Sequence, residues 1–147
     1  MTRRTIAALA AIVVAAGLLG GCSAREPGRE SLETAIPAAL LDSSLGITEA
    51  EANTSTDGLS VNVFTAATFD RASVTADELR EVLQIVVDHT DVGDISRVRV
   101  LGLDGSTAEY DTVDLGAVGE ELGFEPSVSD PGDFVAEWDA VVEFLDR

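Results

Sequence analysis

The turn at Asp57-Gly58, together with the residues that follow it, constrains the fold more than any other part of this sequence. An Asp-Gly pair favours a two-residue turn between antiparallel strands. From Leu59 to Phe69 every second residue is apolar or small, which predicts a strand with one buried face. Residues 47–56, rich in threonine and acids, are the expected partner strand of this hairpin.

A second Asp-Gly pair, Asp104-Gly105, lies 47 residues further along the chain. Residues 95–103 are predicted as the strand before it and residues 108–113 as the returning strand. A predicted helix precedes each hairpin, so we expect a helix–strand–strand unit that occurs twice. These elements predict an α+β fold: a small sheet of about four strands with helices packed on one face, followed by a C-terminal helix.

The two helices that precede the hairpins carry different signals. Apolar residues between Leu32 and Leu40 recur at helical spacing. Because proline is tolerated in the first turn of a helix, Pro37 allows a start as late as Thr34. The second helix is predicted to begin after Thr75, because Thr75 and Glu78 form a capping box.

Two further helices are expected in the C-terminal third. Asp114 is the predicted N-cap of a short helix, with Gly123 in the left-handed position after its end. The last helix is predicted to start at Asp130-Pro131, with the proline in its first turn. We expect Trp138 to lie in the core, because it belongs to an apolar stripe at helical spacing. The stripe consists of Phe134, Trp138, Val141, Val142 and Leu145.

The first residues of the chain follow the plan of a secretory signal. Arg3-Arg4 form a short basic start, and the run from Ile6 to Leu19 contains only apolar and small residues. Gly20-Gly21 then precede Cys22, the only cysteine of the protein. The apolar run is short for a membrane span, which needs about 20 residues.

The ending Leu19-Gly20-Gly21-Cys22 resembles the lipobox of bacterial lipoproteins. The resemblance implies that the Cys22 sulfur receives a diacylglyceryl group, that further acylation with a fatty acid such as palmitate follows, and that Cys22 becomes the new N-terminus. It places the protein at the cell membrane, lipid-anchored on the extracytoplasmic face. Residues 1–21 would be the signal peptide, 22–31 the lipidated cysteine with a flexible tether, and 32–147 a single α+β domain. The alternatives are an uncleaved N-terminal helix and an ordinary signal peptide cut near Cys22.

The charge of the chain limits its partners. The net charge of the full chain is −18 at pH 7. Removal of the predicted signal peptide would take away Arg3 and Arg4 but no acidic residue, so the net charge of the mature chain would be −20. So acidic a surface repels nucleic acid and anionic lipid headgroups. Acyl chains on Cys22, rather than basic patches, would therefore hold the protein at the membrane.

The sequence offers few candidates for chemistry. His89, the only histidine, could act as a general base or a metal ligand, but a histidine in the last turn of a helix also suits the helix dipole. Asp88, Asp91 and Asp94 could bind calcium, although their spacing differs from that of an EF-hand loop. We favour the structural interpretation of all four residues, and predict no catalytic residue, cofactor or metal.

Three functional hypotheses remain. The leading one is a non-enzymatic binding or adaptor module that recognises an envelope protein or a cell-wall component. The alternatives are a small carboxylate-based or calcium-dependent envelope hydrolase, and a carrier for a small apolar ligand. Large apolar groups on the outer face of the sheet, for example Phe64, would favour the binding module. A pocket that converges on His89 and two carboxylates would favour the hydrolase.

Cys22→Ala should block lipidation and leave the precursor uncleaved, because the lipoprotein peptidase acts after acylation. Labelling of growing cells with a fatty-acid analogue, followed by detection on a gel, measures this. Equal incorporation into the wild type and the variant would contradict the resemblance to lipoproteins.

Overall fold

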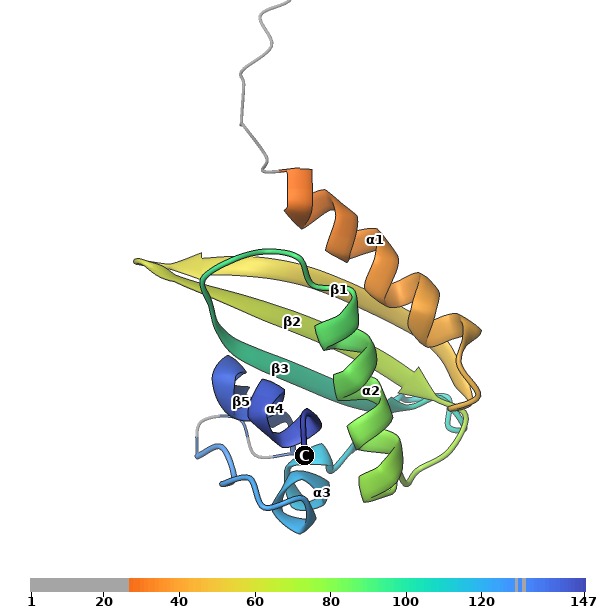
Figure 1. The fold of residues 1–147 in the computed structure, drawn as a ribbon. Coiled ribbons are helices and arrows are strands. Elements are labelled where there is room, and N and C mark those ends of the chain that lie inside the picture. Colours follow the sequence, from red (N-terminus) through yellow and green to blue (C-terminus); the bar gives the residue numbers. More distant parts are fainter. Residues whose placement is uncertain (1–26, 129, 131) are drawn as a thin grey trace, which may run out of the picture.

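The computed structural model describes the backbone of residues 27–128, 130 and 132–147, and side chains from residue 31 onward. The leader and Cys22 lie outside the described residues. The predicted α+β fold is confirmed, with helices and strands mixed along the chain (Figure 1). In order, the elements are α1 (Pro27–Asp42), β1 (Ile47–Asp57), β2 (Ser60–Phe69), α2 (Ala76–Asp88), β3 (Ile95–Asp104), β4 (Asp111–Val113), α3 (Leu115–Glu121), β5 (Phe134–Glu137) and α4 (Trp138–Leu145).

The five strands form one mixed sheet. β1 and β2 are an antiparallel hairpin whose turn is closed by Gly58 at a φ of +62°. β2 and β3 are parallel, and α2 connects them as the crossover. The other edge of β3 is shared by two short antiparallel strands, with β4 opposite residues 102–104 and β5 opposite residues 97–100. β3 is therefore the central strand of the sheet.

The helices lie on one face of this sheet and form the core with it (Figure 1). The inward side chains of β2 and β3 alternate with outward ones, as expected for strands with one face in the core. Thr65, which points inward and is fully buried, has an unpaired hydroxyl. The fully buried side chains include Leu32, Ile36, Leu40, Val63, Phe69, Leu79, Leu83, Val98 and Leu115.

The first helix begins earlier than predicted. α1 starts at Pro27, so residues 27–31, expected to belong to the tether, are helical. The late start at Thr34 that Pro37 would allow is not observed, because Pro37 lies inside the helix. Proline removes one backbone hydrogen bond there. The helix persists because its apolar stripe, Leu32 to Leu40, is buried against β1.

The capping predictions for α2 and α3 are confirmed. Thr75 and Glu78 form the full capping box, with the Thr75 N–H donating to Glu78 Oε2 at 2.8 Å. This hydrogen bond, with the nearby Arg71, lowers the pKa of the Glu78 carboxyl below its usual range. Asp114 caps α3 by accepting a hydrogen bond from the Ala117 N–H at 3.0 Å.

The second helix–strand–strand unit repeats the element order of the first but not its geometry. β4 is only three residues long, and a loop of residues 105–110 separates it from β3. Asp104 is buried and accepts hydrogen bonds from the N–H and hydroxyl of Ser106, at 2.8 and 2.6 Å. A Cβ on Gly105 would come within 2.7 Å of Thr68 Cγ2. This Asp-Gly pair therefore forms a packed bend instead of the expected two-residue hairpin.

The predicted start of the last helix at Asp130-Pro131 is wrong. Residues 134–137 form β5, and α4 begins only at Trp138. The Phe134 side chain is 2% exposed and extends from β5 into the core, whereas the Trp138 side chain is only partly buried against the core. The spacing of apolar residues fits a helix here, but the open edge of β3 provides a strand partner that the local pattern cannot reveal.

Phe134→Ala should lower the free energy of unfolding by about 3–5 kcal/mol, because it empties a fully buried site. Trp138→Ala should cost clearly less, because part of the indole is already in contact with water. Urea denaturation of the two variants and the wild type measures both values. A larger loss for Trp138→Ala than for Phe134→Ala would contradict the observed burial.

Candidate functional site

The residues near the end of α2 make hydrogen bonds within their own helix. His89 is the C-cap of α2 and is exposed, and its Nδ1 lies 2.9 Å from the carbonyl oxygen of Ile85 in the same helix. Asp88 accepts a hydrogen bond from Gln84 Nε2 at 2.8 Å. These local contacts support the structural interpretation of His89.

The three aspartates considered for calcium are also separate from any described cavity. Asp88, Asp91 and Asp94 are exposed. Across the described residues, no group of three His, Cys, Asp or Glu side chains is placed to hold a metal ion. The cavities described below are lined by other residues.

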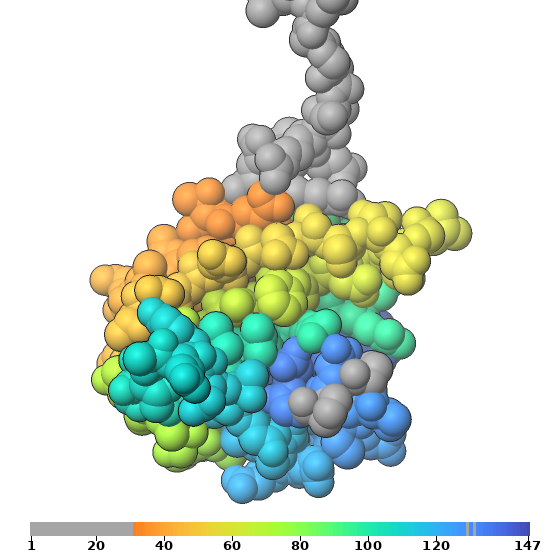
Figure 2. Space-filling model, turned by 180° about the vertical axis from the view of Figure 1, so that it is seen from behind, coloured from red at the N-terminus to blue at the C-terminus, as the bar shows by residue number. Residues whose placement is uncertain are grey.

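The most prominent candidate surface is the face of the sheet opposite the helices. No helix of the described residues covers this face, and Figure 2 views the molecule from this side. Its outward apolar side chains are half-buried: Phe64 and Ala66 on β2, Leu101 and Leu103 on β3, and Val135 on β5. The polar side chains of β1 border it, namely Glu49, Glu51, Asn53 and Ser55.

Arg99 lies at the centre of the interactions on this face. Its Nε is 2.6 Å from Asp133 Oδ2, and its Nη2 is 2.9 Å from Asp130 Oδ1. Its guanidinium carbon also lies 5.6 Å from the centroid of the Phe64 ring, a cation–π distance. The Asp133 side chain is only 9% exposed, so the positive charge of Arg99 balances the negative charge of a nearly buried carboxylate. Arg99 thereby ties the segment before β5 to β2 and β3.

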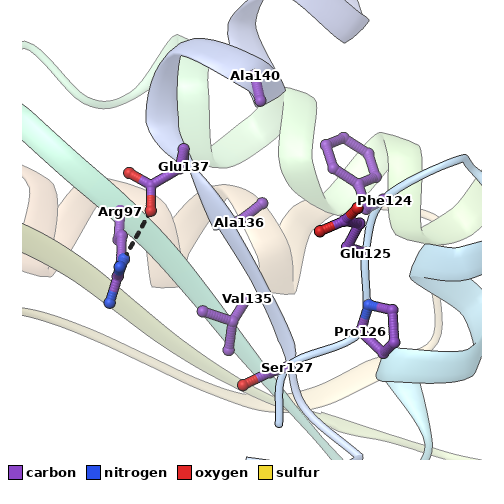
Figure 3. Close-up of a pocket in the computed structure, with 9 residues that line it drawn as sticks. All are labelled: Arg97, Phe124, Glu125, Pro126, Ser127, Val135, Ala136, Glu137 and Ala140. Carbon is purple, nitrogen blue, oxygen red and sulfur yellow. Dashed lines mark hydrogen bonds and ion pairs between the residues drawn. The ribbon is translucent and has the colours of Figure 1, made fainter. Parts of the chain in front are cut away.

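A groove of about 520 Å³ lies beside β5 (Figure 3). One wall consists of Val135, Ala136 and Glu137 on β5, with Ala140 of α4. The segment Phe124–Ser127 forms the other wall, and Arg97 lies on the sheet side and pairs with Glu137 at 2.9 Å (Figure 3).

A second hollow, of about 360 Å³, lies on the uncovered face of the sheet. It is lined by the amides Asn53 and Asn62, by Phe64, and by Arg97, Arg99 and Val135. Arg97 and Val135 also line the groove beside β5. The two cavities are therefore neighbours, and together they form one candidate binding surface of the described domain.

The candidate site residues predicted from the sequence included neither Arg97 and Arg99 nor the residues of β5. The signal for the arginines was present, because Arg97 and Arg99 alternate with Val98 and Val100, which places both cations on one face of a strand. No local signal could have revealed β5, because its strand conformation depends on pairing with β3. Phe64 was singled out correctly as a residue of the outer face.

Comparisons with protein-family models, with curated proteins and with solved structures found no match to this chain. Among the helices of the described residues, none has both the length and the apolar character that crossing a membrane requires.

Arg99→Leu should lower the free energy of unfolding by about 1–3 kcal/mol, because it leaves Asp133 nearly buried without its cation. Arg97→Leu is the matched control on the same strand. Its ion pair with Glu137 is exposed on both sides and should contribute less than about 1 kcal/mol. Thermal and urea unfolding measure both, and equal losses would show that Asp133 does not depend on Arg99.

Proposed function

We propose that this chain is a lipid-anchored lipoprotein of the extracytoplasmic face of the cell membrane, and that its folded domain is a non-enzymatic binding module. The lipobox-like ending at Cys22 supports the anchor and the location. The observation that carries the binding role is the uncovered face of the sheet, with half-buried apolar residues at its centre. The partner would be an envelope protein or a cell-wall component.

The composition of this face suits recognition. Phe64, Leu101 and Leu103 provide apolar contact area, and the arginines and amides around them provide hydrogen-bond donors. Contiguous exposed apolar groups with a polar border are typical of interaction sites. A binding role therefore explains why this face combines both kinds of residue.

The hydrolase alternative receives less support. A carboxylate-based hydrolase needs two convergent acidic groups in a cleft. The acids that line the two cavities are Glu125 and Glu137 in the groove and Asp130 in the hollow. Glu137 is paired with Arg97 and Asp130 with Arg99, which leaves Glu125 without a convergent acidic partner. His89 bonds to its own helix instead. We therefore place the function of this domain in binding.

A photo-crosslinking amino acid at position 103 tests the proposal in intact cells of the native host. We expect a discrete adduct of higher mass from position 103, because Leu103 lies on the uncovered face. Position 41 is the control, because Leu41 is an exposed apolar residue on α1. Digestion of the cell wall before electrophoresis distinguishes a protein partner from a wall polymer. Identical adduct patterns from positions 103 and 41 would refute the assignment of the binding face.

A further inference from the structure

We propose that the groove beside β5 binds an extended, positively charged peptide segment, which adds to the sheet as a strand next to β5. This inference rests on the proposed function, because it names the partner chemistry for one part of the same surface. Its basis is the unpaired edge of β5, the fixed opposite wall of the groove and the negative charge of its side chains.

β5 has one free edge. Within the described residues it pairs with β3 alone. In an antiparallel pair, successive residues point their backbone groups alternately toward the partner strand and away from it. Half of the N–H and C=O groups of β5 therefore point away from β3, on the side where the segment Phe124–Ser127 lies across the groove (Figure 3). Such an edge can accept an added strand through main-chain hydrogen bonds.

The opposite wall is fixed by its own packing, which includes a ring contact with Phe134 at the start of β5. The Phe124 ring makes edge-to-face contacts with Phe134 at 5.0 Å and with Phe144 at 5.2 Å between centroids. The Phe124 N–H also donates to the carbonyl oxygen of Gly119 at 3.0 Å. Pro126 has no N–H to offer to β5. The wall is therefore anchored to the core and to α3, and the groove between it and β5 stays open.

The small side chains along β5 and α4 leave room for a peptide backbone. Ala136 and Ala140 line the groove, and Val135 lies between the groove and the hollow on the sheet face. A strand added here would place alternate side chains on the same face of the sheet as Val135, a residue that the groove and the hollow share.

The charge of the groove selects a cationic segment. Glu125 and Glu137 lie on opposite sides of it (Figure 3). Arg97 pairs with Glu137 at 2.9 Å, whereas Glu125 is exposed and makes no ion pair with another described residue. The chain as a whole carries −18. Lysine or arginine side chains therefore complement this site, and a second copy of the same acidic chain does not.

The detergent-solubilised full-length protein and a fluorescent ten-residue peptide of alternating threonine and lysine test the inference by anisotropy. We expect saturable binding, at least ten-fold weaker binding of the same peptide with glutamate for lysine, and loss of binding when alternate peptide amides are N-methylated. Glu125→Gln should weaken the lysine peptide several-fold and reduce its salt dependence. Glu81→Gln, an exposed acid of α2 on the helix side of the sheet, is the matched control and should have no effect.

Equal binding of the lysine and glutamate peptides, equal binding of the N-methylated peptide, or no binding of any peptide would overturn the inference. A larger effect of Glu81→Gln than of Glu125→Gln would also overturn it, because it would place the peptide on the helix side of the sheet. Crosslinking from position 103 in cells tests the proposed function separately. An adduct in cells without peptide binding would reject only the strand addition at β5.

Discussion

The parallel pairing of β2 with β3 is the constraint on which the rest of the structure depends. Parallel neighbours cannot be joined by a tight turn, so the chain must cross over through α2. The crossover places α2 on the same face of the sheet as α1, and their apolar residues complete the core there. Because β3 then has its second edge open, the C-terminal third of the chain can add β4 and β5 to it.

Few cations are available to a chain with 27 acids and nine basic residues, and two of the described arginines pair with partly or nearly buried carboxylates. Arg99 holds the nearly buried Asp133, and Arg71 holds Glu78 at the start of α2. The Arg99 pair joins segments that are 34 residues apart in sequence, whereas the Arg71 pair is local to the start of α2. The excess of acids over basic residues gives the domain a negative surface.

The same topology produces the candidate binding surface. All helices of the described domain lie on one side, so the outward residues of β2 and β3 remain available to a partner. The short strand β5 extends this surface to a free edge beside the groove. The proposed binding would draw on three independent contributions. The sheet face would provide apolar contact, the edge of β5 would provide backbone hydrogen bonds, and the acidic side chains of the groove would provide negative charge. Their combination fits a protein segment better than a small substrate.

The sequence by itself determined the elements whose signals are local. The turn at Asp57-Gly58, the alternation up to Phe69 and the capping box at Thr75 and Glu78 all act between neighbouring residues, so they were predictable. The proposed signal peptide and lipidation of Cys22 likewise rest on a short local motif. Tertiary structure alone decided that residues 134–137 form a strand, because the free edge of β3 outweighs a local spacing that fits a helix. The position of Pro37 within α1 and the ion pair between Arg99 and Asp133 also depend on tertiary structure. Packing and ion pairing bring together residues that are far apart in sequence, and no local pattern predicts such contacts.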